Sequence, residues 1–223
     1  MPLAYEGEVA QKGEIVGAWS KPEAPLGEGY RSIKWLLPVL FGVVMLVQLT
    51  LCGRRLSQSA DEATHLYAGY RYLKCSDVTI SPEHPPFAKA LAAAPLVAMK
   101  FAVDCAPAAH GDALHQAFES LNWLYTQDWP RALARGREAI SLFGVGLCAL
   151  VWLSASRMFG FRTAILANLL LIFEPNVLGY AALVLTDVPV TCMLLLSVFA
   201  FYLWTQRRSL ALFVLTSVAV GLT

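Results

Sequence analysis

The side chains best suited to acid–base or metal chemistry are concentrated in one polar stretch, residues 59–96. Its sequence is SADEATHLYAGYRYLKCSDVTISPEHPPFAKALAAAPL. Within it, carboxylates and imidazoles occur in two groups, which are Asp61, Glu62 and His65, and then Glu83 and His84. One further carboxylate, Asp187, stands almost alone between apolar residues in LVLTDVPV. In a chain that is 57% hydrophobic, acids gathered in this way predict a site.

The first group follows Ser59 at the predicted start of a helix. Carboxylates there can accept hydrogen bonds from free backbone N–H groups and complement the helix dipole, so helix capping is one interpretation. Asp61 and His65 are also one helical turn apart on one face, as metal ligands can be. A zincin motif HExxH is a poor match, because an aspartate replaces its first histidine.

The second group lies in SPEHPP, where three prolines restrict the backbone and exclude a regular helix. Glu83 and His84 are therefore expected on a stiff, extended segment, where both could ligate a divalent cation. The alternative is a membrane-surface turn that carries a charged pair.

Asp187 and Glu174 lie in or beside apolar runs. An ionisable group at membrane depth is a functional hypothesis by default, although Asp187 could instead cap a helix at the headgroup region. Glu174 precedes Pro175, so we expect it either to line a cavity or to mark a break between two shorter helices.

Composition predicts an all-α, polytopic membrane protein. The mean hydropathy is +0.54 and charged residues make up 15% of the chain, against about a quarter in soluble domains. Four apolar runs approach the roughly 20 residues that a span needs and a fifth stops short at the chain end, so we expect about five spans in a truncated chain. These runs are residues 33–52, 139–156, 163–185, 188–205 and 210–223. The formal net charge of +1 argues against nucleic acid as a partner.

Basic residues predict the orientation of the spans. Under the positive-inside rule, three clusters lie in the cytoplasm together with a flexible tail, residues 1–30. The clusters are Arg31 and Lys34, Arg157 and Arg162, and Arg207 and Arg208. Residues 53–138 and Asp187 then share the extracytoplasmic side.

The long outer segment, residues 53–138, is expected to contain helices that lie along the membrane surface. Three tyrosines are predicted as anchors, and aromatic residues before the second span as an interfacial belt. These are Tyr67, Tyr70 and Tyr72, and then Trp123, Tyr125 and Trp129. Cys75 and Cys105 share this segment and could form a disulfide if it is extracytoplasmic, although spacing alone leaves the pairing open.

Three pieces in order, DEATHLYAGYRYL, SPEHPPFAKALAAAPL and EPNVLGYAALVLTDVP, resemble the N-terminal half of polyprenyl-phosphate-dependent glycosyltransferases of the GT-C superfamily. The protein O-mannosyltransferases and the bacterial aminoarabinose transferases of lipid A are the most similar families, and the resemblance runs from about residue 35 to residue 223. It implies a GT-C-like helical bundle in residues 31–223, in a membrane such as the bacterial inner membrane.

The resemblance also implies roles for individual residues. Asp61 matches the aspartate associated with acceptor activation, and Asp187 matches a second family aspartate. Glu62, His65, Lys89 and Arg137 are expected to bind substrate, with Arg137 as a phosphate partner, and Glu83 and His84 to bind a metal or the donor phosphate. Tyr180 departs from the pattern, because several relatives carry a histidine there.

The expected reaction is transfer of a hexosyl or pentosyl group from a polyprenyl-phosphate donor to a hydroxyl or phosphate of a lipid, glycan or protein acceptor. Nucleotide sugars are made inside the cell, whereas the acids are expected on the outer face. A sugar on a lipid phosphate, already moved across the bilayer, would reach them. A divalent metal cation is a possible cofactor. Two alternatives stay open. One is a proton-coupled transporter that uses Asp187 and Glu174. Transporters often contain internal sequence repeats, and no repeat is visible between the two halves of this chain. The other is an inactive membrane fragment.

Overall fold

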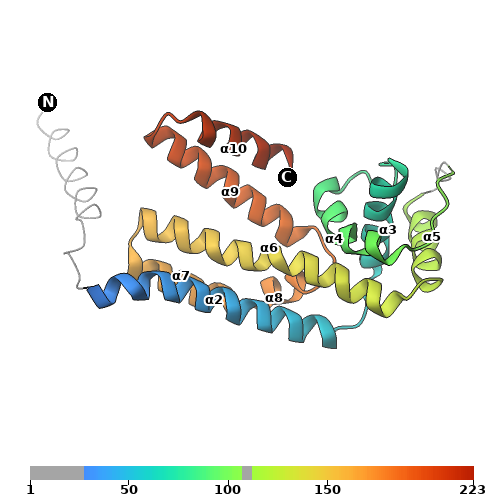
Figure 1. Cartoon of the computed structure of the whole chain (residues 1–223), viewed down its shortest axis with the longest axis horizontal. Coiled ribbons are helices and arrows are strands. Elements are labelled where there is room, and N and C mark those ends of the chain that lie inside the picture. Colours follow the sequence, from blue (N-terminus) through green and yellow to red (C-terminus); the bar gives the residue numbers. More distant parts are fainter. Residues whose placement is uncertain (1–27, 107–111) are drawn as a thin grey trace, which may run out of the picture.

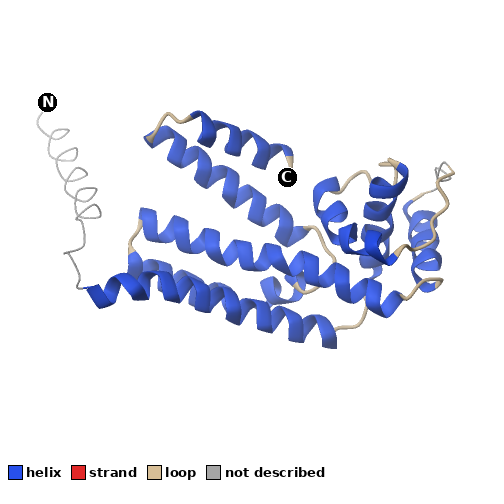
Figure 2. Cartoon of the chain, in the orientation of Figure 1, coloured by secondary structure: helices blue, strands red, loops and turns tan. Residues whose placement is uncertain are grey.

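A computed structural model describes residues 28–106 and 112–223, with side chains from residue 35 onward. The described chain is helical and contains no strand (Figures 1 and 2), which confirms the predicted all-α class. The predicted tail lies outside the described residues except for residues 28–30, which already belong to α2. The helices are α2 Glu28–Arg55, α3 Ala60–Cys75, α4 Pro86–Met99, α5 Ala113–Tyr125, α6 Trp129–Met158, α7 Phe161–Ile172, α8 Pro175–Ala181, α9 Asp187–Gln206 and α10 Leu210–Gly221.

Three helices are long and apolar enough to cross a membrane: α2, from Trp35 to Arg55, α6 and α9. The helices α2 and α6 lie side by side in Figure 1, and α9 packs on α6. Their outward faces remain apolar, with Leu36, Val43 and Leu194 more than half exposed. Apolar side chains around the whole circumference are what lipid contact requires of a helix.

The third predicted span, residues 163–185, is not one continuous helix. It is divided into α7 and α8, whose axes differ by 63°. The break falls at Phe173 and Glu174, where the side chain of Glu174 accepts a 2.6 Å hydrogen bond from the backbone N–H of Val177 and so caps α8. Pro175 at the first position of α8 suits a helix start and cannot continue α7. Of the two alternatives for Glu174, the helix break is therefore correct.

The number of spans is lower than the five predicted. The described residues contain three spans, or four if α7 and α8 together count as one. The fifth apolar run forms α10, which has 12 residues and packs against α9. At a rise of 1.5 Å per residue a helix of this length is too short to cross a hydrocarbon core.

The predicted outer segment, residues 53–138, is shorter than expected, because α2 continues to Arg55 and α6 begins at Trp129. Between them α3, α4 and α5 form a compact unit at one end of the bundle (Figure 1), which we call the lobe. The helices α3 and α4 pack very closely. A Cβ added at Gly69 would lie 2.0 Å from the carbonyl oxygen of Lys89, so this contact requires glycine.

Two of the three predicted tyrosine anchors are buried inside the lobe instead of facing lipid, and the third, Tyr72, is half-buried. Tyr67 is 4% exposed and Tyr70 is fully buried, and both pack against the ring of Trp123. The indole N–H of Trp123 donates to the carbonyl of Ala102, so this residue is also part of the lobe core. Because a buried tryptophan needs a partner for its polar atom, this hydrogen bond makes the interior position of Trp123 possible. Of the predicted belt, Tyr125 and Trp129 are exposed.

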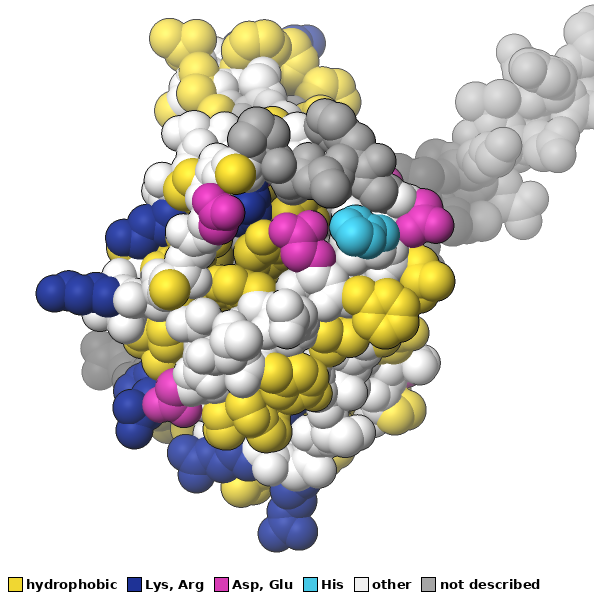
Figure 3. Space-filling view, turned by 90° about the vertical axis from the view of Figure 1, so that its right-hand side faces the viewer, with side chains coloured by type: hydrophobic (Ala, Val, Ile, Leu, Met, Phe, Trp, Pro, Cys, Tyr) yellow, Lys and Arg dark blue, Asp and Glu magenta, His cyan; other side chains and the backbone are white. Residues whose placement is uncertain are grey.

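The surface of the lobe is mixed in character. Figure 3 looks onto this end of the molecule and shows acidic and hydrophobic side chains on the same face, with Lys and Arg toward one edge. Exposed apolar residues include Leu114 and Phe118 of α5. The capping of α5 is regular, because the carboxylate of Asp112 accepts a hydrogen bond from the backbone N–H of His115.

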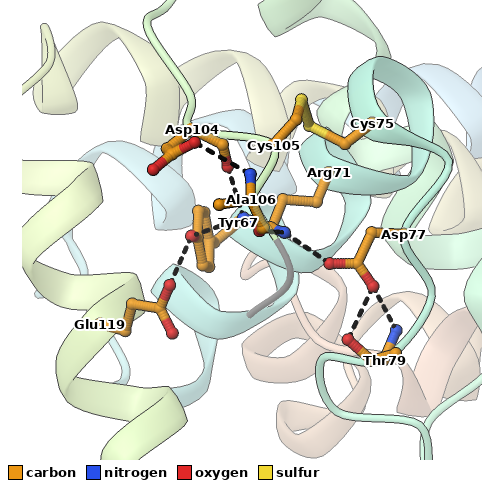
Figure 4. A network of polar contacts seen from close by, with 9 residues as sticks. All are labelled: Tyr67, Arg71, Cys75, Asp77, Thr79, Asp104, Cys105, Ala106 and Glu119. Atoms are coloured by element: carbon orange, nitrogen blue, oxygen red, sulfur yellow. Dashed lines mark hydrogen bonds and ion pairs between the residues drawn. A yellow bond between two sulfur atoms is a disulfide. The ribbon is translucent and has the colours of Figure 1, made fainter. Parts of the chain in front are cut away.

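A buried arginine and a disulfide hold the lobe together (Figure 4). Arg71, 2% exposed, donates to the carboxylate of Asp77 and to the carbonyls of Asp104 and Ala106. The Cys75–Cys105 disulfide joins α3 to the same segment, which confirms the pairing that spacing left open. The sequence alone gave no sign of the arginine network, because its acceptors are mainly carbonyl groups distant in sequence.

Candidate functional site

One cavity brings together the residues that the sequence singled out in separate motifs. It has a volume of about 820 Å³ and lies between the start of α3, the segment before α4, the helix α8 and the start of α9. Asp61, His65, His84 and Asp187 all line it. Asp61 and Asp187 are exposed, and neither carboxylate accepts a hydrogen bond or forms an ion pair within the described ranges. Two free carboxylates therefore face one cavity from segments that are far apart in the sequence.

The neighbouring acids Asp61 and Glu62 have opposite environments. Asp61 faces the cavity, whereas Glu62 is fully buried. Consecutive helical residues point about 100° apart, so one helix turn can present one acid outward and the other inward. Glu62 accepts hydrogen bonds from the backbone N–H groups of Ser59, at 2.9 Å, and Val184, at 2.8 Å. The second bond fixes the turn before α9 to the start of α3.

Arg137 completes this arrangement from α6. Its Nε and one Nη donate to the two oxygens of Glu62 at 2.8 and 2.7 Å. The remaining donors reach the carbonyls of Gly53, Leu56 and Ser57 at the end of α2. A guanidinium has five N–H donors, and all five are engaged here. This geometry leaves Arg137 no free donor for a phosphate and favours a positioning role for both Arg137 and Glu62.

His65 lies at the wall of the cavity in a fixed orientation. Its Nδ1 is 2.9 Å from the carbonyl oxygen of Val184, and since a carbonyl can only accept, Nδ1 carries the hydrogen. In the neutral ring Nε2 is then an acceptor. Burial is the main cause that lowers the pKa of His65 below its ordinary value of 6.5, and the nearby positive charges of His84 and Lys89 act in the same direction. His84 packs edge-on against His65 with ring centroids 5.0 Å apart.

Lys89, a predicted substrate ligand, is buried beneath the cavity wall instead of lining the cavity. Its ammonium donates to the carbonyl of Ser81 at 2.5 Å and lies 5.3 Å from the centroid of the Tyr72 ring. Burial lowers the pKa of Lys89 to about 8. Ser81 has a φ of 51°, a left-handed conformation that is uncommon for residues other than glycine. Lys89 thus supports the unusual backbone that leads into the Glu83–His84 segment.

The expected metal ligands form only part of a coordination shell. Glu83 Oε1 is 4.0 Å from His84 Nε2 and also accepts a 3.2 Å hydrogen bond from Ser81. Within residues 28–106 and 112–223, no group of three or more His, Cys, Asp or Glu side chains is placed to hold a metal ion. Two protein ligands do not make a closed site for a divalent cation, so no chemical step is assigned to a metal here.

The second half of the cavity wall comes from α8 and the start of α9. Asp187 is the first residue of α9, where the helix dipole stabilises a negative charge. The hydroxyl of Thr186 is 3.4 Å from Nδ1 of His84 and joins this wall to the lobe. Tyr180 also lines the cavity, so its aromatic ring stands where several relatives are expected to carry histidine.

Residues 136–223 match the family model described as dolichyl-phosphate-mannose-protein mannosyltransferase. No curated protein and no solved structure matches the chain. The matched part is less than half of the chain and runs from the eighth residue of α6 to the end of α10 and beyond, so it includes Arg137 and Asp187. The segment that carries Asp61, His65 and His84 lies before it, and the fold brings the two parts together at one cavity. This similarity supports a membrane glycosyltransferase of the GT-C kind.

Proposed function

We propose that the protein transfers a sugar from a polyprenyl-phosphate-linked donor to an acceptor hydroxyl or phosphate at the extracytoplasmic membrane face. The observation that carries this proposal is the shared cavity of Asp61 and Asp187, whose carboxylates remain uncommitted while the adjacent Glu62 is buried in an ion pair. The family match over residues 136–223 supports the class of donor, a sugar on a lipid phosphate.

In this mechanism the acceptor oxygen attacks the anomeric carbon of the donor sugar. The carboxylate of Asp61 takes the proton of the attacking hydroxyl, a new bond forms between that oxygen and the anomeric carbon, and the bond from the anomeric carbon to the phosphate oxygen breaks. The polyprenyl phosphate leaves with the bonding electron pair. Asp187 orients the acceptor from the opposite wall.

The leaving phosphate needs a positive or hydrogen-bonding partner. No Lys or Arg among the described residues lines the cavity, and Lys89 and Arg137 are engaged elsewhere. His84 lines the cavity together with Asp61 and Asp187, and in its protonated form it could donate to a phosphate oxygen. A cation bound jointly by Glu83, His84 and the donor phosphate would serve the same purpose, and remains a prediction.

The extracytoplasmic orientation is supported by the disulfide. Disulfides persist in oxidising compartments and are rare in the cytosol. The Cys75–Cys105 disulfide lies in the lobe, which also supplies Asp61, His65 and His84 to the cavity, so it agrees with the orientation predicted from the basic residues.

A transfer assay on the full-length protein in liposomes, with a radiolabelled polyprenyl-phosphate sugar, tests the proposal. We expect Asp61→Asn to reduce transfer by about 100-fold or more, because general-base catalysis contributes at least that factor. Asp187→Asn should reduce transfer by about 100-fold, because a misplaced acceptor can lose that factor. Asp128→Asn, which changes an exposed carboxylate paired with Arg131 outside the cavity, is the matched control and should retain transfer. Full activity in both cavity variants would refute the proposal.

The transporter alternative is less well supported by the geometry. It needs Glu174 as a carboxylate that can take up and release protons, but Glu174 caps α8 and also accepts from the side chain of Asn176 at 2.8 Å. Proton-coupled uptake by the full-length protein in liposomes, lost in Asp187→Asn, would restore this alternative.

A further inference from the structure

A second concavity is lined by Arg137, which does not line the cavity that holds the two aspartates. It has a volume of about 690 Å³ and runs between the last turns of α2 and the first turns of α6; we call it the α2/α6 groove. The two helices lie side by side here in Figure 1. The acids and imidazoles of the first cavity do not line this groove.

The groove is amphipathic along its length. At its deeper end it is lined by Leu46 and Leu49, which lie within the span Trp35–Arg55, and Leu133 lies one turn of α6 after Trp129. At the other end it is lined by Tyr125, Trp129 and polar residues. Tyr125 and Trp129 pack edge to face with ring centroids 5.5 Å apart, and the hydroxyl of Tyr125 donates to Gln58 at 3.1 Å. Tryptophan and tyrosine favour the headgroup level of a bilayer, so the groove leads from headgroup depth into the hydrocarbon region.

The charges at the polar end are balanced with one exception. Arg137 is neutralised by Glu62 at 2.7 Å, and Glu138 is neutralised by Arg135 at 2.8 Å. Arg54 is exposed, lines the groove, and forms no ion pair or hydrogen bond within the part of the chain that the structure describes. The groove therefore presents one uncompensated positive charge at headgroup depth.

We propose that the α2/α6 groove binds an anionic bilayer phospholipid. One acyl chain lies against Leu46, whose side chain is 41% exposed, and the headgroup phosphate lies at Arg54 beneath the aromatic pair of Tyr125 and Trp129. Charge complementarity selects an anionic headgroup, since an arginine near the membrane surface attracts anionic lipids. The proposal requires that the protein spans the membrane and is independent of the transfer reaction proposed for the other cavity.

Photocrosslinking in nanodiscs tests this site with the full-length protein. The probe is phosphatidylglycerol with a diazirine on one acyl chain, compared with phosphatidylcholine carrying the same chain, and labelled peptides are identified by mass spectrometry. We expect phosphatidylglycerol to label residues 46–53 and 129–141, and unlabelled phosphatidylglycerol to compete.

Two pairs of variants separate headgroup from acyl-chain contacts. Arg54→Gln should reduce competed labelling about fivefold, the effect of one arginine near the surface. Arg162→Gln, an exposed arginine at the opposite end of the bundle, should leave it unchanged. Ala134→Phe should also reduce labelling by filling the groove, whereas Ala211→Phe, at an exposed alanine of α10, should not.

Equal labelling by both lipids that does not respond to Arg54→Gln would overturn the proposal. So would labelling confined to other faces of the bundle. The proposal also fails if no lipid labels the groove and another part of the protein occupies it. A disulfide between a cysteine placed at position 134 and a second engineered cysteine elsewhere in the chain would show such a helix contact.

Discussion

Glu62 and Arg137 form a buried two-pronged ion pair, with Nε–Oε1 and Nη–Oε2 distances of 2.8 and 2.7 Å. Through this pair and its backbone hydrogen bonds, the end of α2, the start of α3, the start of α6 and the turn before α9 are joined at one point. The positions of Asp61 and Asp187 relative to each other depend on these four segments. Glu62 and Arg137 are therefore best interpreted as positioning residues.

A double-mutant cycle on this pair tests the interpretation. Glu62→Met and Arg137→Met should each reduce the free energy of unfolding by about 3–5 kcal/mol, because each leaves a buried charge unpaired. The double variant should lose much less than the sum, giving a coupling energy of about 2 kcal/mol or more. Unfolding would be followed by SDS titration in mixed micelles.

The exposed ion pair Arg135–Glu138 is the matched control, because it lies on the same helix at 2.8 Å. Its coupling energy should not exceed about 0.5 kcal/mol. A buried pair with no stronger coupling than this exposed pair would contradict a positioning role.

The close contact between α3 and α4 should not tolerate a methyl group added at Gly69. Gly69→Ala places a Cβ 2.0 Å from the Lys89 carbonyl, so the helices must separate, and we expect a loss of about 2–3 kcal/mol in the free energy of unfolding. Gly179→Ala is the comparison, since nothing lies within 4 Å of its added Cβ. Thermal unfolding monitored with a thiol-reactive dye measures both. Equal stability of the two variants would show that α3 and α4 are not in such close contact.

Lys89 should make stability depend on pH in the alkaline range. Its pKa is about 8 in the folded chain against 10.5 for an ordinary lysine, so unfolding takes up a proton between these values. Stability of the wild type relative to Lys89→Met should therefore rise as the pH rises from 8 to 10.5, by up to on the order of 3 kcal/mol.

The free energies of unfolding of the wild type and of Lys89→Met are measured at pH 7.5, 9 and 10.5. In their difference, the contributions of groups that titrate in both proteins cancel. Lys74→Met, at an exposed lysine of the same lobe, should show no such relative rise. A pH-independent difference between wild type and Lys89→Met would mean that burial does not lower the pKa of Lys89 in the folded chain.

The disulfide provides a measurement of orientation. In intact cells that carry the full-length Cys52→Ser protein, a membrane-impermeant maleimide should label the chain only after treatment with an impermeant reductant, because the two remaining lobe cysteines are then freed. Cys148 and Cys192 are buried and should not react. Removing Cys75 and Cys105 by substitution with Ser should abolish the labelling. Labelling that requires permeabilised cells would place the lobe in the cytoplasm.

The sequence by itself determined the class of the protein and the identity of most site residues. Hydropathy identified α2, α6 and α9, because a span must be apolar over its whole length whatever it packs against. Helix-start signals located α3 near Ser59. The prolines at positions 82, 85 and 86 correctly excluded a regular helix before α4, but the predicted extended segment is a turn, in which the backbone N–H of His84 donates to the carbonyl of Ser81. Asp61, His84 and Asp187 were found because polar side chains are conspicuous in an apolar chain.

Tertiary structure alone decided which of these residues are free and which are committed. Asp61 and Glu62 are indistinguishable as sequence neighbours, yet one faces the cavity and the other pairs with Arg137. Arg137 and Lys89 looked like phosphate ligands because a sequence shows a charge and not its partner; their acceptors are largely backbone carbonyls from other segments. The same holds for Tyr67 and Tyr70, whose burial depends on packing against Trp123. Contacts between residues distant in sequence are made only when the helices assemble, and they determine the function of each side chain.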